Sequence, residues 1–254
     1  MSQDKKDLTG KRALVTGSSG GIGKHIALGL ARAGADVVFN YKSHREAAEE
    51  AAEAARGFGV RAFVLGADAS HRDEVRRLVC DAATAMGGLE ILINNVGEFA
   101  EKKLRDHTDQ DFERIIAGTV GATFYATMAA LPHLAEAGWG RVVNIGAAGA
   151  EVALGRRGIG PHLAGKAAVC SLTRSFALEE SRHGITFNVV NPGVVEERDL
   201  SRQEAESRRD KKNPVRRPGT SADVVDAVLF FCKPESSFIN GAILNVTGGW
   251  QGEA

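Results

Sequence analysis

The sequence is short of prolines and tyrosines, has only three cysteines, and carries no excess of charge of either sign. Lysine plus arginine equals aspartate plus glutamate at 32 each, so the net charge gives no reason to expect nucleic acid or an anionic membrane as a partner. No Pro/Gly/Ser-rich linker divides the 254 residues, which predicts a single domain over 1–254. The six prolines stand beside 30 glycines, a ratio that suits many tight turns between strands and helices.

The cysteines Cys80, Cys170 and Cys232 are odd in number and widely spaced, each in an apolar helical context. No Cys-x-x-Cys pair or His/Cys cluster occurs, so no metal site is predicted. We expect reduced core thiols in a cytoplasmic protein. The first ten residues are polar, and no apolar run approaches membrane-spanning length, so we expect neither a secretion signal nor a membrane partner.

Short apolar runs alternate with longer amphipathic ones along the whole chain, which is typical of βαβ units in a parallel sheet covered on both faces. This pattern predicts an α/β fold. We expect strands near residues 12–16, 36–40, 61–66, 90–94, 141–145, 186–191 and 242–246. We expect helices near 22–33, 44–56, 71–86, 109–133, 162–183 and 222–232. Capping-box spacing marks four helix starts, at Ser43/Glu46, Ser70/Asp73, Thr108/Asp111 and Thr220/Asp223.

The segment 193–221 interrupts this alternation with charged clusters at 196–199, 208–212 and 216–217. It predicts a mobile lid over a site. Its charges either form a solvated helical surface or make a basic rim for an anionic substrate or a carrier protein.

The stretch Thr16–Gly23 joins the apolar run 13–15 to a helical pattern. Glycines there allow a sharp turn and a close approach to a pyrophosphate, and a helix N-terminus offers free N–H groups to the anion. Two other interpretations stay open: residues 17–21 also match the Gly-x-Ser-x-Gly nucleophile elbow of hydrolases, and the glycines could serve only a tight turn. The elbow leaves Gly23 unexplained, and no Asp or His elsewhere has a motif that completes a triad.

Five motifs in order resemble the short-chain dehydrogenase/reductase (SDR) family, closest in style to β-ketoacyl-carrier-protein reductases, from about residue 8 to 250. They are Thr16–Gly23, Ala67-Asp68, Asn94-Asn95-Val96-Gly97, Asn191-Pro192-Gly193, and Asn240-Gly241 with Gly248-Gly249. The resemblance implies a single-domain, doubly wound Rossmann sheet of seven parallel strands with a dinucleotide across its carboxyl edge. It also implies a homo-oligomer, a dimer or tetramer formed through the helices near 109–133 and 162–183.

The resemblance further implies a cofactor role for particular residues. The phosphates would lie against Gly17, Ser19, Gly21, Ile22 and Gly23. Asp68, next to Ala69, would meet the adenine amine, and Asn95 and Gly97 would flank the adenosine ribose. Lys166 would bind the nicotinamide ribose, with the nicotinamide backed by Pro192, Gly193 and Val195.

The end of the second strand bears on the choice of cofactor. An NAD site calls for a carboxylate there to bind the ribose 2′-OH, but the sequence reads Asn40-Tyr41-Lys42-Ser43. Lys42, Ser43 and Arg45 could instead hold a 2′-phosphate, which favours NADP over NAD. Against this, Gly20 occupies the position where many NADP-preferring relatives carry a basic residue.

The catalytic positions depart from the family pattern. His162-Leu163-Ala164-Gly165-Lys166 stands where the family has Tyr-x-x-x-Lys, and neither Tyr41 nor Tyr125 has a lysine four residues further on. The family serine is matched by Ala147 and its helix asparagine by Thr119, and Glu197 replaces the threonine that contacts the nicotinamide carboxamide. Catalysis by a tyrosinate is therefore excluded.

His162 and Lys166 are the remaining catalytic candidates, four residues apart on one helix face. The lysine charge should lower the histidine pKa, so that a neutral imidazole could accept a proton or donate an N–H hydrogen bond. His162 could equally be a helix-start residue with a local hydrogen bond. Glu98 and Glu151, in loops expected to border the cleft, are further acid/base candidates.

Three functions remain open at this stage. The first is an NADP(H)-dependent oxidoreductase that reduces a small-molecule carbonyl substrate, free or carrier-bound, with the cofactor supplying most of the chemistry. The second is a catalytically silent scaffold, partner subunit or cofactor-dependent regulator, and the third a non-redox enzyme such as a cyclase or dehydratase. The first is preferred because drift of a dead enzyme should also have eroded the phosphate turn.

Overall fold

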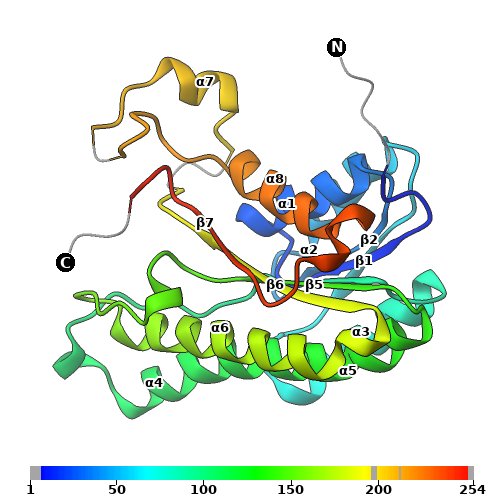
Figure 1. Ribbon diagram of the computed structural model, residues 1–254, viewed down its shortest axis with the longest axis horizontal. Helices are drawn as coiled ribbons and strands as arrows, with labels where there is room; N and C mark the ends of the chain where they lie inside the picture. The colour runs from blue at the N-terminus through cyan, green and yellow to red at the C-terminus, as the bar shows by residue number, and fades with distance from the viewer. Residues whose placement is uncertain (1–6, 196–198, 212, 251–254) are drawn as a thin grey trace.

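Seven parallel strands form the centre of the computed structural model, which describes residues 7–195, 199–211 and 213–250 (Figure 1). The strands are β1 (Arg12–Val15), β2 (Asp36–Tyr41), β3 (Ala62–Gly66), β4 (Ile91–Asn94), β5 (Gly140–Ile145), β6 (Ile185–Pro192) and β7 (Ile243–Val246). Their order in the sheet is β3-β2-β1-β4-β5-β6-β7. Each predicted strand is thus confirmed, and the order is that of a doubly wound sheet.

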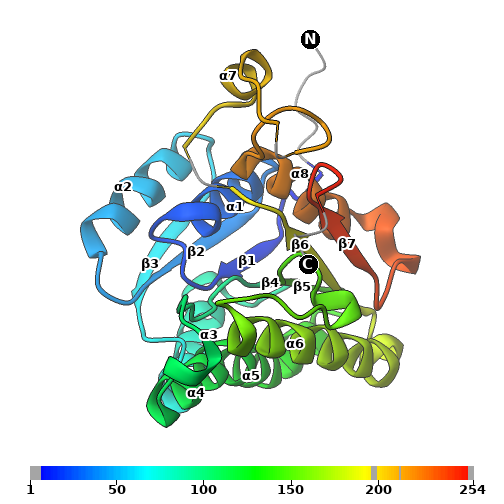
Figure 2. The ribbon, with the colours of Figure 1, turned by 90° about the vertical axis from the view of Figure 1, so that its left-hand side faces the viewer.

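Helices cover both faces of the sheet (Figures 1 and 2). On one face lie α1 (Gly21–Arg32), α2 (Arg45–Arg56) and α8 (Ser221–Cys232). On the other lie α3 (Arg72–Met86), α5 (Ala122–Glu136) and α6 (Gly160–Glu180). Successive residues of β1 serve opposite layers, because Ala13 and Val15 belong to the core under the first group of helices and Leu14 to the core under the second.

The chain changes direction in the sheet beside β1. It runs outward from β1 to β2 and β3, and then returns to place β4 on the other side of β1. At such a switch point the loops after neighbouring strands separate and leave a crevice at the carboxyl edge. The predicted site residues follow these strands, so the topology brings their segments to one edge.

Two of the four capping boxes predicted at helix starts are present in the structure. Thr108 and Thr220 each accept the N–H of the aspartate three residues on, in complete capping boxes. The boxes expected at Ser43 and Ser70 are wrong, because α2 and α3 begin one residue later, after His44 and His71, with no side-chain cap. A third box, Ser201 with Glu204, starts the short helix α7 (Arg202–Ser207) and was not predicted.

The region 109–133 is longer and less regular than expected. The helix α4 (Asp109–Ile116) runs through the π-helical turn η2 (Ala117–Gly121) into α5. Together these residues form a continuous 28-residue segment that is long and apolar enough to cross a membrane, which corrects the expectation that no such segment exists. The segment packs against α3, α6, β4 and β5, the position of a core helix in this fold.

The cysteines also differ from expectation. Cys170 and Cys232 are buried, as predicted, but Cys80 is exposed, since it lies on the outer face of the amphipathic helix α3. All three are free thiols.

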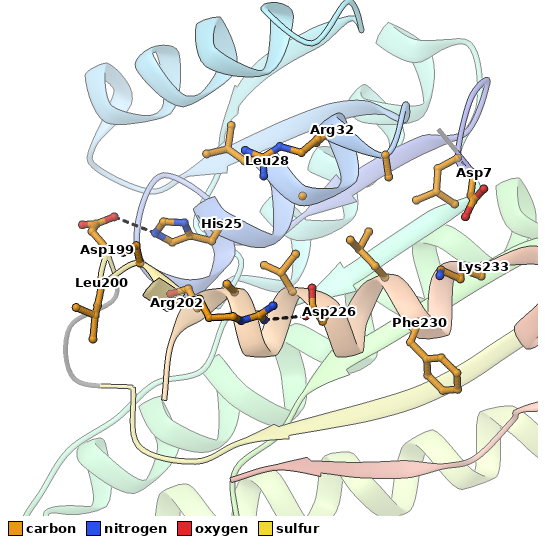
Figure 3. Close-up of a pocket in the computed structure, with 18 residues that line it drawn as sticks. Asp7, His25, Leu28, Arg32, Asp199, Leu200, Arg202, Asp226, Phe230 and Lys233 are labelled. Atoms are coloured by element: carbon orange, nitrogen blue, oxygen red, sulfur yellow. Dashed lines mark hydrogen bonds and ion pairs between the residues drawn. The ribbon is translucent and has the colours of Figure 1, made fainter. Parts of the chain in front are cut away.

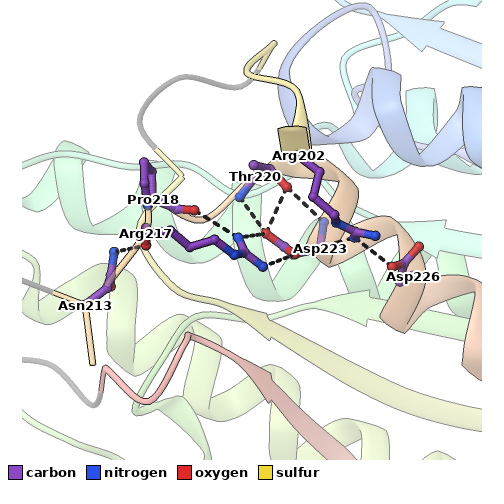
Figure 4. Close-up of polar contacts among 7 residues, drawn as sticks. All are labelled: Arg202, Asn213, Arg217, Pro218, Thr220, Asp223 and Asp226. Atoms are coloured by element: carbon purple, nitrogen blue, oxygen red, sulfur yellow. Dashed lines mark hydrogen bonds and ion pairs between the residues drawn. The ribbon is translucent and has the colours of Figure 1, made fainter. Parts of the chain in front are cut away.

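The described part of the segment 193–221 extends away from the sheet and carries α7 (Figure 1). Its charged side chains are partly paired: Arg217 forms a bidentate ion pair with Asp223 of α8, with both N–O distances 2.8 Å, and Arg202 contacts Asp226 at 2.7 Å (Figure 4). The Arg217 guanidinium is therefore not free to meet an anionic ligand. Residues 196–198 and 212, including Glu197, lie outside the described residues.

Candidate cofactor and active site

The turn after β1 requires glycine at three positions for two different reasons. Gly17 and Gly21 have φ angles of +61° and +57°, in the left-handed region that side chains disfavour. Gly23 has no room for a side chain, because a Cβ atom there would lie 2.5 Å from both the Gly17 carbonyl oxygen and Asn95 Nδ2. Helix α1 begins directly at this turn. The helix start therefore remains open for the close approach of an anion.

Ser18 and Asn40 hold the turn from beneath. Ser18 Oγ donates to the Val15 carbonyl at 2.8 Å and accepts the Asn40 N–H at 2.9 Å. Asn40 Oδ1 accepts the Gly17 N–H at 2.9 Å, and its Nδ2 donates to the Ala67 carbonyl at 3.1 Å. Asn40 is 1% exposed, so it positions the turn instead of presenting its amide to a ligand. The supporting role of Ser18 was missed, because the motif reserves no role for that residue.

Ser19 and Ile22 lie half-buried in the same turn. The nucleophile-elbow interpretation requires a hydrogen bond from Ser19 to a histidine. The described ranges contain no such bond. The hydrolase alternative therefore loses its support.

Asn95 and Gly97 follow β4, and they approach the turn after β1 and Lys166, respectively. Asn95 Nδ2 donates to the carbonyls of Thr16 and Gly17, both at 3.0 Å. At Gly97, a Cβ would lie 2.8 Å from Lys166 Nζ. Asn95 thus fastens the loop after β4 to the phosphate turn, and Gly97 leaves space for the lysine.

The ends of β2 and β3 are joined by an ion pair. Lys42 Nζ lies 2.7 Å from Asp68 Oδ2, and Asp68 also accepts the Ser70 N–H and hydroxyl. Partial burial raises the pKa of Asp68, but the bonds from Lys42 and Ser70 outweigh this and lower it to about 2. Lys42 and Ser43 are exposed, whereas Ala69 is buried. A basic and an acidic group predicted to meet different parts of one ligand thus stand in direct contact.

The carboxyl end of β6 is fixed by backbone contacts. The Gly193 N–H donates to the Val246 carbonyl at 2.9 Å, and the Pro192 carbonyl accepts the Ala148 N–H at 3.2 Å. A Cβ at Gly193 would lie 2.9 Å from Thr247 Cα, so this position also requires glycine. Val195 is half-buried and packs against the core below α1 and α8.

Two cavities adjoin the segment after β6. A small one of about 210 Å³ is lined by Gly193, Val195 and segment residues that include Val215 and Arg217. A larger groove of about 760 Å³ lies between α1, α8 and residues 199–202 (Figure 3). None of the predicted cofactor or catalytic residues lines the larger groove, so it is separate from the site at the sheet edge.

Lys166 is held at the end of β5. Its Nζ donates to the Ile145 carbonyl at 2.6 Å, and the residue is 4% exposed. Burial lowers the pKa of Lys166 to about 8.

His162 lies in the first turn of α6 and is tied to a distant loop. Its Nδ1 is 2.9 Å from the Glu98 carbonyl oxygen, and its ring contacts Phe99 edge to face with centroids 5.2 Å apart. The expectation of a local helix-start hydrogen bond is thus wrong. Burial is the main cause that lowers the pKa of His162, and Lys166 adds to it, while the bond to Glu98 opposes them. The predicted direction of the shift is confirmed, although burial and not the lysine is its larger cause.

Among the described residues, the other positions at which the family has catalytic residues carry no free acid or base. Ala147 follows β5 without a hydroxyl group, and Thr119 is fully buried in the π-helical turn with no partner for its Oγ1 among the described residues. Glu98 forms an ion pair with Arg114. The Glu98 carboxylate and the Arg114 guanidinium are therefore engaged with each other.

The Glu151 carboxylate is likewise engaged by hydrogen bonds. Its two carboxylate oxygens accept hydrogen bonds from Asn191 Nδ2 at 2.9 Å and Asn245 Nδ2 at 2.8 Å. The cluster ties the 3-10 turn η3 (Ala150–Val152) to the ends of β6 and β7. Among the described residues, Glu98 and Glu151 are thus both engaged in side-chain contacts, and His162 and Lys166 are the other two candidates predicted from the sequence.

Known proteins share this architecture. A family model described as enoyl-(acyl carrier protein) reductase matches residues 17–251. Gluconate 5-dehydrogenase of Gluconobacter oxydans is 36% identical over 253 residues, covering 97% of this chain and 96% of that protein. A 3-oxoacyl-(acyl-carrier-protein) reductase of Staphylococcus aureus is 32% identical over 241 residues, covering 94% and 97%.

Solved structures agree. A short chain dehydrogenase from Burkholderia cenocepacia in complex with NADP has a TM-score of 0.87 at 35% identity, covering 97% of this chain and 100% of that one. A blue fluorescent protein from a metagenomic library in complex with NADPH has a TM-score of 0.86 at 34% identity, with the same coverage. The resemblance stated from the sequence motifs is confirmed: the chain is an oxidoreductase of the short-chain dehydrogenase/reductase family.

Proposed function

We propose that this chain is an NADP(H)-dependent oxidoreductase that interconverts a small-molecule carbonyl compound and its alcohol at a site without the family tyrosine and serine. One observation carries the proposal: the turn after β1 is built so that Gly23 packs against Gly17 and Asn95 where any Cβ would collide. This close packing keeps the helix start free for a pyrophosphate. The NADP and NADPH complexes of two similar structures support the choice of cofactor.

The residues present fit a dinucleotide laid across the sheet edge. The open N–H groups at the start of α1, with Ser19, Gly21 and Ile22, would hold the phosphates. Asp68, Ala69, Asn95 and Gly97 would line the adenosine side, and Pro192, Gly193 and Val195 the nicotinamide side. When bound, this cofactor supplies or takes up a hydride. Lys166 would bind the nicotinamide ribose, and His162 would stand beside the substrate.

NADP over NAD is the finer part of the proposal. Lys42 and Ser43 are exposed at the end of β2, where a 2′-phosphate would add a charge-assisted contact. A paired fluorescence titration with NADPH and NADH tests it. We expect tighter binding of NADPH, and a loss of most of that difference in Lys42→Ala, while Lys24→Ala on α1 serves as a lysine control. Absence of NADPH binding would refute the proposed function.

A silent, cofactor-binding relative is the second candidate, because Ala147 and Thr119 occupy reaction positions and Glu98 and Glu151 are engaged in structural contacts. Turnover on a carbonyl panel that His162→Phe or Lys166→Ala abolishes would exclude it. Binding of NADPH with no turnover on any substrate would favour it.

Further parts of the proposal concern the surroundings of the site. The segment 193–221 would act as the substrate lid, since it contributes to the 210 Å³ cavity beside Gly193. The substrate would be a small carbonyl compound, free or carrier-bound, as the names of the gluconate and 3-oxoacyl relatives suggest. A homo-oligomer remains a prediction from the family resemblance, and a cytoplasmic location remains a prediction from the three widely spaced cysteines. The single domain is proposed from the chain length and the lack of a linker.

A further inference from the structure

The hydrogen bond between His162 and Glu98 determines which ring nitrogen carries the proton. A backbone carbonyl oxygen can only accept, so Nδ1 must be the donor at its 2.9 Å contact with the Glu98 oxygen. In the neutral imidazole the other nitrogen then carries a lone pair. The loop after β4 therefore fixes Nε2 of His162 as a proton acceptor.

Nε2 of His162 is also free to accept a proton from a bound molecule. It has no hydrogen-bond partner in the described ranges, and it is not among the buried polar atoms left without one, so it reaches solvent. Phe99 contacts the ring edge to face and restricts its rotation. Nε2 of His162 is thus a fixed and accessible base.

The charged groups around His162 do not favour a proton on it. On its own helix, Lys166 opposes a second positive charge. From the loop after β4, the Glu98 carboxylate is bound to Arg114 of α4. From η3, the Glu151 carboxylate is bound by two asparagine side chains. Glu101, in the same loop, lies against Gly158, and among the described residues no carboxylate raises the pKa of His162.

We propose that the site works as a secondary-alcohol dehydrogenase, in which Nε2 of neutral His162 is the general base that accepts the hydroxyl proton. The proposal rests on the proposed function and gives it a direction. The alcohol O–H bond breaks and its proton passes to Nε2, while the carbinol carbon gives up its hydride to the oxidised nicotinamide. Two electrons leave the alcohol, a C=O bond forms, and the proton departs from Nε2 to solvent.

Carbonyl reduction needs the opposite state of the same group. The imidazole must then carry a proton at Nε2 to give to the nascent alkoxide, and this form is the minor one at neutral pH because burial and Lys166 lower the pKa of His162. Oxidation is therefore the direction for which the resting form of the site is prepared, and reduction depends on acid.

Rate profiles from pH 5 to 9 test the proposal in both directions, with 1-phenylethanol and NADP⁺ against acetophenone and NADPH, and with gluconate as a second alcohol. We expect kcat/KM for oxidation to be level above the His162 pKa and to fall tenfold per pH unit below it. For reduction, kcat/KM should fall tenfold per unit above that pKa. His162→Gln should lower kcat/KM for oxidation by about 100-fold or more and remove the acid limb, whereas His183→Gln, at an exposed histidine, should change neither.

Nitrogen-15 NMR of labelled protein reads the tautomer without turnover. We expect the protonated-nitrogen signal at Nδ1 and the lone-pair signal at Nε2 of His162. The reverse tautomer, or NADPH binding with no oxidation of either alcohol, would overturn this proposal and leave the cofactor site intact. Failure to bind NADPH would instead overturn the proposed function itself.

Discussion

The glycines of the turn after β1 differ in how much room each has for a side chain. Gly23 sits where a Cβ would meet the backbone oxygen of Gly17 at 2.5 Å. Gly20, three residues earlier, has extended backbone and no atom within 4 Å of the Cβ it could carry. The two positions therefore form a natural pair for testing the turn.

Gly23→Ala should damage the turn and Gly20→Ala should not. Overpacking against a fixed carbonyl costs about 1–3 kcal/mol, so we expect Gly23→Ala to lower the free energy of unfolding by this amount and to weaken NADPH binding at least tenfold. Gly20→Ala should stay within about 0.5 kcal/mol of the wild type and bind NADPH normally. Urea denaturation and fluorescence titration measure both. Equal effects of the two substitutions would refute the packing argument.

At the residue scale the sequence predicts the positions of the turn glycines and of Lys166 on its helix, because spacing alone determines where such residues fall on a turn or helix face. It predicts side-chain partners poorly. Asn40, at the end of the second strand, is predicted from the sequence to be a cofactor-binding residue, but its amide is engaged by the backbone of two neighbouring segments. The bond between His162 and Glu98 joins residues 64 positions apart, and no local pattern in the chain encodes such a contact.

The start of α8 is held by several side-chain hydrogen bonds. Asp223 accepts hydrogen bonds from the Thr220 N–H and hydroxyl and a bidentate pair from Arg217 (Figure 4). Burial raises the pKa of Asp223, but the bonds from Arg217 and Thr220 lower it well below its usual range. The start of α8 and the residues just before it in the segment 193–221 thus share one carboxylate.

This carboxylate should make stability depend on acid. A carboxyl group whose pKa is lower in the folded state contributes fully above its unfolded value of about 3.9, and the contribution is lost as the pH falls toward the folded value. We expect the free energy of unfolding to fall more steeply between pH 5 and pH 2 in the wild type than in Asp223→Asn. At pH 7, Asp223→Asn should cost about 1.5–3 kcal/mol, the range for hydrogen bonds to charged groups.

Thermal unfolding over this pH range, with Asp73→Asn as control, checks the prediction. Asp73 also lies in the first turn of a helix and pairs with an arginine, but its side chain is 81% exposed. Parallel curves for the wild type and Asp223→Asn would contradict the role given to Asp223.

At the element scale the hydrophobic periodicity located all seven strands and every long helix to within a few residues, because buried faces repeat at the period of the element. The π-helical turn at 117–121 was not predicted, since one inserted residue shifts the pattern too little to detect. The capping boxes predicted at Ser43 and Ser70 are absent. Capping-box spacing is necessary, but it does not decide which of two adjacent residues becomes the N-cap.

At the scale of the whole molecule, α4, α5 and α6 lie in one helical layer (Figure 2), and each carries a large exposed apolar side chain. Phe112, Met128 and Leu178 are 50%, 42% and 83% exposed. Exposed apolar side chains on helices of one layer are compatible with a surface that another subunit covers. This is the layer through which the family resemblance predicts assembly.

The double substitution Met128→Glu with Leu178→Glu should therefore break the assembly. Light scattering is expected to give a multiple of the 26.9 kDa chain mass for the wild type and the single-chain mass for the variant, with the NADPH affinity kept. Phe238→Glu, at a fully exposed side chain on the 3-10 turn η5 (Pro234–Phe238), should leave the assembly intact. A monomeric wild type, or dissociation by Phe238→Glu alone, would contradict this interface.

The ion pair between Lys42 and Asp68 gives the molecule an internal competitor for its own ligand. A 2′-phosphate that recruits Lys42 must first displace a carboxylate 2.7 Å away, so the gain is an exchange of one anion for another. Discrimination between the two cofactors should then be smaller than a solitary lysine would give, and Asp68→Asn should widen it. On the proposed NADP preference, the selectivity would equal the attraction of Lys42 for the 2′-phosphate minus its attraction for Asp68.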